Sequence, residues 1–319
     1  MSPRRIPHLF GGLALSLTVS ACGYAPTQVP EAAPPPTPTA AAPAEAPTCD
    51  DATMSYAPPD TMPAPGAMPD GSTMKEIQDR GRLIVGVSAD SYLLGSRNPQ
   101  SGQIEGFDID IARAVAEAIL GDPDRIELRV ITAADRIPVL ETGAVDIVAR
   151  NMTMTCARWE QIGFSEVYYQ SGQKILVRQG SSITGLNSLD GERVCAPNGT
   201  SSMDNLIRLA PGAEPVGASN HTGCLVLFQR GEVDAITGDD TVLAGLAAQD
   251  PYAVVLDEEP FSDEPYGIGV AREDTDLAAF INGVLEEMSR DGRWQEAYDR
   301  WLAPTLGAGS QPEPLHGRG

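Results

Sequence analysis

The sequence predicts an α/β protein that folds into two similar lobes, and three observations support this. Apolar strands and amphipathic helices alternate from Lys75 onward, which is typical of α/β sheets. A short pattern, Gly143-Ala-Val-Asp-Ile147, recurs as Gly231-Glu-Val-Asp-Ala235, each time between a helix and a strand. The order of strands and helices around both copies also matches. A Gly after a helix is a routine cap, but the shared order favours two lobes over a chance repeat.

The first series of elements opens with a strand over 82–88 and a turn-rich loop through Asn98-Pro99. A helix is predicted over 108–120, because its apolar residues fall on one face. A strand over 126–131, a helix over 133–142 and a strand over 145–150 follow. Since the last strand carries the first copy of the repeated pattern, we expect these elements to build one sheet.

The second series begins at Lys174. Strands are predicted over 174–179, 193–197, 215–219 and 233–238, and helices near 201–209, 221–230 and 240–249. A strand over 266–271 and helices over 276–290 and 294–302 complete the folded part. The tail after Pro304 is predicted to be disordered.

The formal net charge of -22 disfavours nucleic acid as a partner, because phosphate binding needs a basic face. Net charge says little about small ligands, since local groups set the field of a site. No CxxC motif or paired histidine indicates a metal, and no cofactor is expected.

The N-terminus reads as a signal peptide over 1–21. Arg4 and Arg5 precede a short apolar stretch, and Ala21 is followed directly by Cys22, as in a bacterial lipobox. This predicts cleavage before Cys22 and lipidation of its thiol, with a plain signal peptide as the alternative. Residues 23–72 hold 13 of the 27 prolines, so 22–73 is predicted to be a lipid-anchored, semi-rigid tether.

Four further cysteines, an even number in an exported chain, indicate two disulfides with three possible pairings. Cys195 ends a predicted strand and Cys224 opens a predicted helix in the same stretch of chain, so we pair these two. Cys49 and Cys156 are then left to pair, which would attach the end of the tether to the folded body.

The two repeated strands end in side chains of opposite character. The first leads into Arg150-Asn-Met-Thr-Met-Thr-Cys-Ala-Arg158, and the second into Gly238-Asp239-Asp240. Ligands of open α/β sheets bind beyond the carboxyl ends of strands. One lobe would therefore offer cations and hydroxyls and the other carboxylates, which suits a ligand with an anionic and a cationic end. An amino acid has both.

Each candidate ligand-binding residue also has an alternative explanation, in which it only stabilises the fold. Arg158 would bind the α-carboxylate through its planar fork of donors, with Asn151 and Thr153 as neutral donors. A surface ion pair is the alternative for Arg158. Asp239 would bind the ammonium group, and Asn198-Gly-Thr-Ser-Ser202 could bind an anion at a helix start. Asp239, His221 and the Ser and Thr residues could equally be helix caps.

From about Met74 to Leu302 the chain resembles family 3 extracellular solute-binding proteins, which deliver amino acids to ABC importers. The resemblance is carried by Gly106-Phe-Asp-Ile-Asp-Ile-Ala112, Asn151 to Arg158 with Phe164-Ser165, Gly199-Thr-Ser201, and Asp234 to Asp240. It is greatest to actinobacterial glutamate/aspartate-binding lipoproteins, which share the tether and the cysteines.

This resemblance implies a ligand site. The family's α-carboxylate binders fall on Asn151, Thr153 and Arg158, and its ammonium-binding carboxylate falls on Asp239. An Arg-Ile-Pro arginine that holds the ligand's side-chain carboxylate falls on Arg136, while two further contacts fall on Ser201 and His221. The chain departs from the pattern at Ser88, where relatives often carry a second cation. Arg97 and Arg150 are the candidates to take its place. Recognition of the side-chain carboxylate by Arg136 alone would let neutral asparagine bind as well.

The resemblance also implies the two-lobed type II periplasmic-binding-protein fold. Lobe 1 would comprise 74–170 and 267–303, lobe 2 would comprise 171–266, and a two-segment hinge would lie near 169–171 and 263–266. The implied protein is a monomeric, membrane-anchored carrier that closes on an acidic amino acid and presents it to an ABC permease. One alternative is a ligand sensor for a membrane receptor of a kinase pathway. The other is a dehydratase of arogenate or prephenate, although no nucleophile–base pair stands out.

Overall fold

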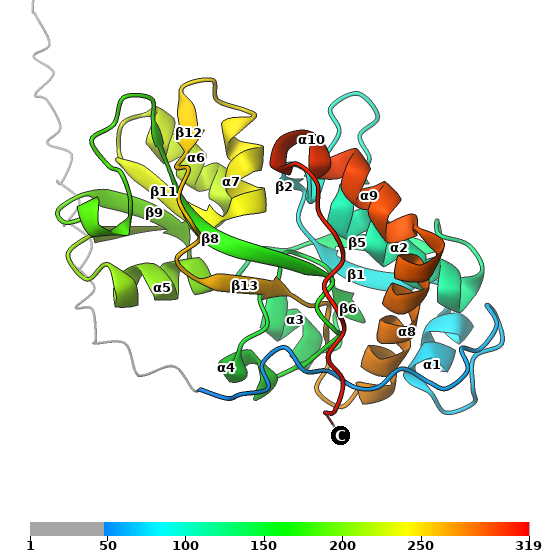
Figure 1. The fold of residues 1–319 in the computed structure, drawn as a ribbon. Helices are drawn as coiled ribbons and strands as arrows, with labels where there is room; N and C mark the ends of the chain where they lie inside the picture. The colour runs from blue at the N-terminus through cyan, green and yellow to red at the C-terminus, as the bar shows by residue number, and fades with distance from the viewer. Residues whose placement is uncertain (1–47, 319) are drawn as a thin grey trace, which may run out of the picture. The chain divides into compact units, whose positions relative to one another are not determined.

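The computed structural model of the protein describes residues 48–318 (Figure 1). The predicted signal peptide, Cys22 and the tether up to residue 47 lie outside the described residues. Within 48–318, no helix is both long enough and apolar enough to cross a membrane. The described strands form two open sheets and one small antiparallel sheet.

The first sheet has the strand order β5-β1-β6-β14-β7. Its strands are β1 (Leu83–Val87), β5 (Ile126–Val130), β6 (Ile147–Val148), β7 (Gly163–Phe164) and β14 (Gly269–Val270). β1 pairs in parallel with β5 and β6, whereas β14 runs antiparallel to β6 and β7. All of β1 is buried, which is why it reads as a nearly continuous apolar run.

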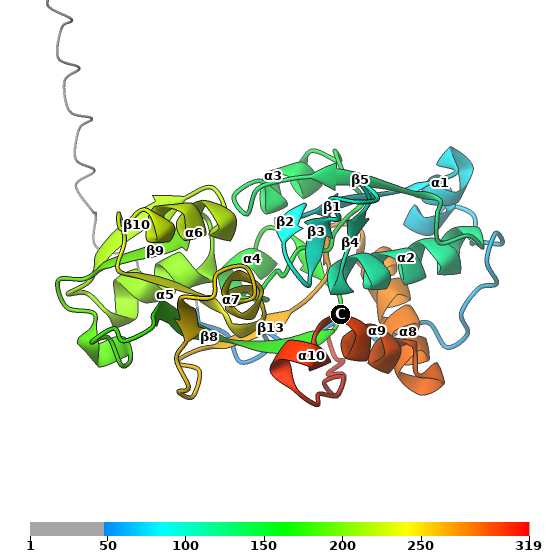
Figure 2. The same cartoon turned by 90° about the horizontal axis from the view of Figure 1, so that it is seen from above.

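Helices pack around this sheet and carry most of its core. They are α1 (Thr73–Arg80), α2 (Phe107–Leu120), α3 (Arg136–Glu141), α4 (Cys156–Trp159), α8 (Thr275–Asp291), α9 (Arg293–Trp301) and α10 (Ala303–Leu306). Phe107, Phe280 and Trp294, from α2, α8 and α9, are almost wholly buried in one cluster. Figure 2 shows α1, α2, α8 and α9 gathered on the side of the first sheet.

The second sheet has the order β10-β9-β11-β8-β12, with β13 also paired to β8. Its strands are β8 (Tyr169–Arg178), β9 (Arg193–Pro197), β10 (Glu214–Ala218), β11 (Ala235–Asp239), β12 (Ala253–Val255) and β13 (Asp263–Tyr266). Around it lie η1 (Leu186–Ser188), α5 (Ser201–Leu209), α6 (His221–Gln229) and α7 (Asp240–Ala247). Cys195 in β9 and Cys224 in α6 form a disulfide inside this core.

The repeated pattern has the same structural role in both sheets. Asp146, just before β6, accepts a hydrogen bond from the backbone N–H of Ile84 in β1 at 2.7 Å. Asp234, just before β11, accepts one from the backbone N–H of Arg193 in β9 at 3.0 Å. Each aspartate therefore satisfies a donor at the start of the neighbouring strand, which accounts for the repeat physically.

Two paired strands, the long β8 and the short β13, connect the sheets. β8 and β13 pair antiparallel with Tyr169 opposite Tyr266 and Ser171 opposite Glu264, and Figure 1 shows them running together between the two groups of elements. The segments in which the sequence predicts chain crossings, 169–171 and 263–266, are thus direct neighbours.

Several short elements have no counterpart in the predictions. The strands β2 (Asp90–Ser91), β3 (Gly95–Arg97) and β4 (Ile104–Glu105) form the small sheet inside the segment predicted as a loop. Gly106 follows it with φ 144°, and a Cβ there would lie 2.3 Å from the carbonyl O of Leu94. Helices α1, α4 and α10 and the strands β7 and β12 also went unpredicted.

The predicted tether ends earlier than residue 73. Ser55 and Met68 are buried, and Tyr56 and Met62 pack against the first core. Composition misleads here, because apolar side chains that pack on the body are interspersed among the prolines. Cys49 is joined to Cys156, which attaches this segment to α4.

The tail after Pro304, predicted to be disordered, instead forms α10 and then packs against residues 48–56. Ser55 and His316 form a parallel bridge, with the Ser55 N–H donating to the Leu315 carbonyl at 2.8 Å. Residues 48–56 and 311–318 together are called the terminal strap below. The tail gains its order from this partner segment, which its own composition cannot indicate.

Candidate ligand-binding site

The residues predicted to bind ligand gather between the two sheets. Each stands just after a strand or in the first turns of a helix, where backbone donors are free. Arg136 begins α3, Arg158 lies in α4, Ser201 and His221 begin α5 and α6, Asn151 and Thr153 lie between β6 and α4, and Asp239 ends β11. With Arg150 and Glu264 they form what we term the polar cluster, in which every residue except the partly exposed Ser201 is buried.

Three buried arginines supply the positive charge of the polar cluster. Arg136 donates to the carbonyl O of Asn151 at 3.0 Å, and Arg158 donates to that of Thr153 at 2.5 Å. Arg150 donates to the Ile131 carbonyl at 3.0 Å. Burial lowers the pKa of all three, and the charges of Arg158 and Arg150 lower that of Arg136 further. Among residues 48–318, none of the three forms an ion pair with a carboxylate.

Asp239 faces these cations from the second sheet. It is 4% exposed, and its Oδ2 accepts a hydrogen bond from the Tyr266 hydroxyl at 2.7 Å. Burial raises the pKa of Asp239 to about 7; the nearby Glu264 charge also raises it, whereas the hydrogen bond from Tyr266 opposes the shift. A cation placed beside Asp239 would therefore favour its ionised form.

Glu264 belongs to the cluster, although the sequence did not predict it as a site residue. One carboxylate oxygen, Oε2, accepts hydrogen bonds from the hydroxyls of Thr153 and Ser201, each at 2.6 Å. The other, Oε1, accepts from Ser262 at 2.8 Å and Asn205 at 3.0 Å. The available signal was a glutamate inside the second predicted hinge segment, 263–266. Its position on β13 makes it a link between both lobes.

Two buried polar atoms in the cluster have no hydrogen-bond partner among residues 48–318: Asn151 Oδ1 and His221 Nε2. Asn151 has a positive φ of 35°, which Asn tolerates better than most residues, and its N–H donates to Asp108 at 2.9 Å. Burial, reinforced by the charge of Arg150, lowers the pKa of His221 to about 3. The imidazole is therefore neutral at ordinary pH.

Arg97 and Arg150, the two candidates for the second cation that relatives carry at the position of Ser88, lie in different surroundings. Ser88 donates to Asp90 Oδ1 at 2.8 Å and stabilises a turn. Arg97 is exposed and donates to the Gly102 carbonyl, outside the polar cluster. Arg150 is 4% exposed, and its charge acts on both His221 and Arg136. Of the two arginines considered from the sequence, Arg150 is the one that belongs to the cluster.

The segments flanking the cluster are in direct contact across it. Arg136 Nη2 donates to the Gly199 carbonyl at 3.2 Å, and the hydroxyl oxygens of Thr153 and Ser201, which both donate to Glu264, lie 3.1 Å apart. Thr222 donates to the Asp90 carbonyl at 3.1 Å. These bonds join elements of the first sheet to elements of the second, so the arrangement described is a closed one.

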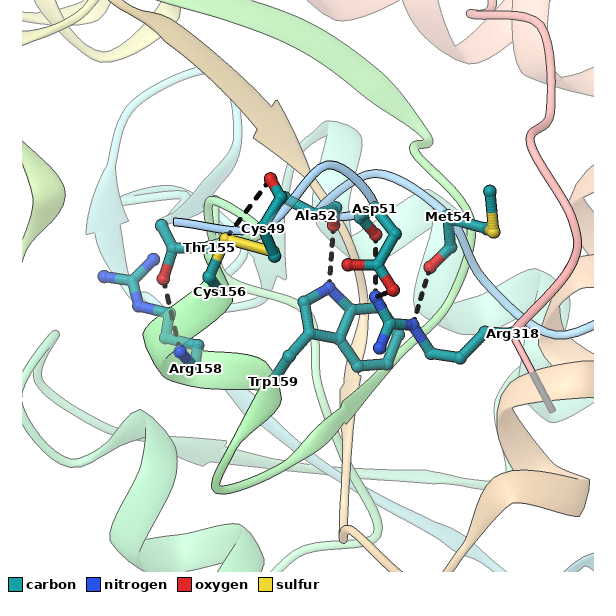
Figure 3. The surroundings of a disulfide bond; sticks show 9 residues. All are labelled: Cys49, Asp51, Ala52, Met54, Thr155, Cys156, Arg158, Trp159 and Arg318. Atoms are coloured by element: carbon teal, nitrogen blue, oxygen red, sulfur yellow. Dashed lines mark hydrogen bonds and ion pairs between the residues drawn. A yellow bond between two sulfur atoms is a disulfide. The ribbon is translucent and has the colours of Figure 1, made fainter. Parts of the chain in front are cut away.

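The helix that carries Arg158 is held from outside by the terminal strap (Figure 3). Cys156, the first residue of α4, is bonded to Cys49, and the Trp159 indole N–H donates to the Ala52 carbonyl at 2.7 Å. Thr155 caps the helix by accepting from the Arg158 N–H at 3.3 Å. Arg158 therefore has a fixed support on the side away from the cluster.

Two α/β lobes with buried charges of both signs between them define a two-lobed solute-binding protein. The chain belongs to the bacterial extracellular solute-binding proteins, family 3, whose family model matches residues 83–304. Its fold is the type II periplasmic-binding-protein fold, as the resemblance in sequence predicts.

Individual relatives agree with this membership. The chain is 38% identical over 231 residues to the ABC transporter glutamine-binding protein GlnH of Bacillus subtilis, covering 72% of this chain and 84% of the relative. It is 32% identical over 262 residues to the glutamate-binding protein GluB of Corynebacterium efficiens, covering 79% and 87%. Among solved structures, an ancestral arginine-binding protein bound to glutamine has a TM-score of 0.66 and 33% identity, covering 72% and 99%.

Proposed function

We propose that the protein captures an acidic amino acid, glutamate or aspartate with asparagine as a further candidate, by closure of its lobes. The observation that carries this proposal is the burial, opposite Asp239, of three arginines that form no ion pair within the described part of the chain, residues 48–318. Buried like charges are unfavourable unless an anion accompanies them. A ligand with two carboxylates and one ammonium group would compensate both sides of the cluster.

In this proposal each residue has one role. Arg158, Thr153 and Asn151 bind the α-carboxylate, and Asp239 binds the ammonium group. Arg136, with Ser201 and His221, binds the end of the side chain. Each charge-assisted hydrogen bond would contribute about 1.5–3 kcal/mol.

Closure follows from the proposed lobes, 74–170 with 267–303 and 171–266. Arg158 and Asp239 belong to different proposed lobes, so one ligand can contact both residues only when the lobes are closed. Ligand binding therefore stabilises the closed arrangement. The paired strands β8 and β13 are the proposed hinge. The bonds across the cluster, such as Arg136 to Gly199, support this interpretation because they exist only when the lobes meet.

We further propose that the closed protein is a monomer anchored to the cell membrane through lipidated Cys22, and that it docks on the permease of an ABC importer. The names of relatives such as GlnH support the importer as partner. A membrane receptor remains the alternative partner. Pull-down from membranes with and without ligand distinguishes the two, and Cys22→Ser should release the protein into the medium.

Glutamine is a second candidate ligand, and His221 favours it. A hydrogen bond to the backbone of Thr237 raises the pKa of His221, as expected when the ring donates. A neutral ring that donates through one nitrogen accepts through the other, so unpartnered Nε2 suits an amide N–H₂. A ligand carboxylate could pair with it only if the ring took up a proton.

Calorimetry with Glu, Asp, Asn, Gln and His tests both candidates. Every ligand whose ammonium group ionises Asp239 should release a proton from it. Acidic ligands bound beside His221 should in addition take up a proton, so the dependence of the heat on the buffer's ionisation enthalpy should differ between the acidic ligands and Gln. Arg158→Ala should abolish the binding of every ligand, and Arg136→Ala should lower the affinity for acidic ligands more than that for neutral ones. Arg97→Ala is the matched control, because that arginine is exposed. Heat from Gln alone would exclude the acidic ligands, and heat from none would exclude all five amino acids as ligands.

A further inference from the structure

A second group of ionisable side chains lies outside the polar cluster, beneath the terminal strap. Glu166, between β7 and β8, is fully buried, and its Oε2 lies 3.0 Å from Nε2 of His316. Its other oxygen, Oε1, has no hydrogen-bond partner among residues 48–318. Burying a carboxylate oxygen without a hydrogen bond or a bound ion is unfavourable, so the unpaired Oε1 indicates that a further group binds here.

Glu286 of α8 completes a group of three potential metal ligands. Its Oε1 lies 3.8 Å from His316 Nε2, and the ligand atoms of Glu166, Glu286 and His316 all lie within 4.8 Å of one another. Glu166, Glu286 and Gln311 line one pocket of about 240 Å³. Gln311 Oε1 is likewise buried and without a partner among the described residues. Two of the residues that line this pocket, Glu166 and Gln311, thus each have one oxygen without a partner among residues 48–318.

We propose that Glu166, Glu286 and His316 bind one divalent transition-metal ion, with Zn²⁺ the best match. Two carboxylates and a neutral imidazole carry two negative charges, which a dication neutralises. Mixed nitrogen and oxygen ligands suit Zn²⁺ better than Ca²⁺, which prefers oxygen alone. Gln311 Oε1 or a water would supply a fourth ligand.

The spacing of the ligand atoms fits such an ion. Zinc bonds of about 2.1 Å in tetrahedral geometry place neighbouring ligand atoms roughly 3.4 Å apart. The measured 3.0 Å and 3.8 Å separations lie on either side of that value. A direct ion pair between His316 and Glu166 would satisfy Oε2 only and leave Oε1 unpaired, whereas an ion bound by both oxygens of Glu166 would satisfy each of them.

The metal would fasten the terminal strap to the body. His316 is bridged to Ser55 within the strap, whereas Glu166 and Glu286 belong to the body around the first sheet. No member of the polar cluster takes part, so the proposal stands whether or not the protein binds an amino acid.

Zinc titration of the full chain, after treatment with EDTA, tests the proposal by calorimetry and thermal unfolding. We expect one Zn²⁺ per chain and a Tm that rises with zinc concentration, because the ion binds the folded state. His316→Ala should abolish binding and Glu286→Gln should weaken it at least tenfold. Glu287→Gln, next to Glu286 but outside the group, is the matched control and should bind normally.

Co²⁺ gives an independent measurement, since its visible absorption reports tetrahedral nitrogen and oxygen ligands. The Co²⁺ band should appear with the unsubstituted chain and with Glu287→Gln, and be absent with His316→Ala. Three outcomes would overturn the proposal: no Zn²⁺ binding, binding that His316→Ala leaves intact, or Ca²⁺ binding in preference to Zn²⁺. Circular dichroism verifies that His316→Ala is folded.

Discussion

A Cβ atom placed on Gly245 would lie only 2.6 Å from the backbone carbonyl O of Tyr92. Gly245 is in α7, beside the second sheet, whereas Tyr92 lies in the turn between β2 and β3 next to the first. Nearby, Thr222 of α6 donates to the Asp90 carbonyl at 3.1 Å. The two halves of the described structure therefore meet here without room for one methyl group.

Gly245→Ala should weaken ligand binding without weakening the fold. Ala is favoured over Gly in a helix by about 1 kcal/mol, so α7 itself should gain. The closed arrangement would have to relieve a contact with the Tyr92 backbone, at about 1–3 kcal/mol, which corresponds to roughly 5- to 150-fold lower affinity. Calorimetry measures the affinity and thermal unfolding the stability.

Gly223→Ala is the matched control for this prediction. Gly223 is also in a helix of the second half, and a Cβ there would meet only Asn220 and Ala218 of the same half. The ligand affinity of the Gly223→Ala variant should stay close to that of the unchanged chain. Equal affinities for Gly245→Ala and the control would contradict closure at this contact.

Affinity for glutamine, which leaves His221 neutral, should fall on acidification because of Asp239. Proton uptake by His221 would offset this effect for an acidic ligand, so glutamine is the ligand for this measurement. Its pKa is about 7, so at pH 6 most of this carboxyl is protonated and cannot pair with an ammonium group. We expect about tenfold weaker binding at pH 6 than at pH 8. Asp239→Asn should bind weakly with a flat profile, and a flat profile in the unchanged chain would exclude Asp239 as the ammonium partner.

The stability of the ligand-free protein should respond to pH in the opposite direction. The pKa of Asp239 is raised from 3.8, so the folded state retains a proton that the unfolded chain releases. The stability linked to this group is complete below about pH 4 and is lost as pH rises through about 7. The Tm difference between Asp239→Asn and the unchanged chain should therefore grow from pH 5 to pH 8, as thermal scans can measure.

The sequence predicted the elements whose periodicity is strong, and the structure explains the exceptions. The helix expected over 108–120 is α2, and the strands and helices of the second half agree within a few residues except for β8, which begins at Tyr169. β2, β3 and β4 are too short to show alternation. The terminal strap was missed because its order depends on contacts between the two ends of the chain, which composition does not reveal.

The members of the polar cluster predicted from the sequence could be found because they follow strand ends, where α/β proteins place ligands. Glu264 could not be found this way, since it lies within β13 and owes its place to pairing with β8. Its hydrogen bonds to Thr153 and Ser201 join residues more than sixty positions away in the chain. Such a network is a property of tertiary structure, and spacing along the sequence does not contain it.

The two disulfides should differ in reactivity. Cys195 and Cys224 are fully buried, whereas Cys49 is exposed and Cys156 is partly exposed. A mild thiol reductant should therefore reduce Cys49–Cys156 first, because exchange requires access to a sulfur. Alkylation followed by mass spectrometry measures the order, and simultaneous reduction of both bonds would contradict it.

Loss of the Cys49–Cys156 bond should also destabilise the protein. It closes a loop across a sequence separation of 107 residues, so removing it should lower the free energy of unfolding by about 2–4 kcal/mol. The double substitution Cys49→Ser with Cys156→Ser tests this by denaturant unfolding. Mild reductant should not destabilise the double variant further, which serves as the control.

Arg318→Ala should loosen the terminal strap. The guanidinium carbon lies 3.9 Å from the centre of the Trp159 ring, Nη2 donates to the Asp51 carbonyl at 2.7 Å, and Nε donates to the Met54 carbonyl at 3.1 Å (Figure 3). A cation–π contact and two charge-assisted bonds, partly screened, should together contribute about 1–2 kcal/mol to the free energy of unfolding.

Arg300→Ala is the control for this change, since Arg300 forms an exposed ion pair with Asp110 and should contribute less than about 1 kcal/mol. Denaturant unfolding measures both variants. Trp159 fluorescence should shift to the red in Arg318→Ala, because removal of the guanidinium opens one face of the indole to water. If Arg318→Ala were no more destabilising than Arg300→Ala, and its fluorescence unchanged, the strap would not be held by this contact.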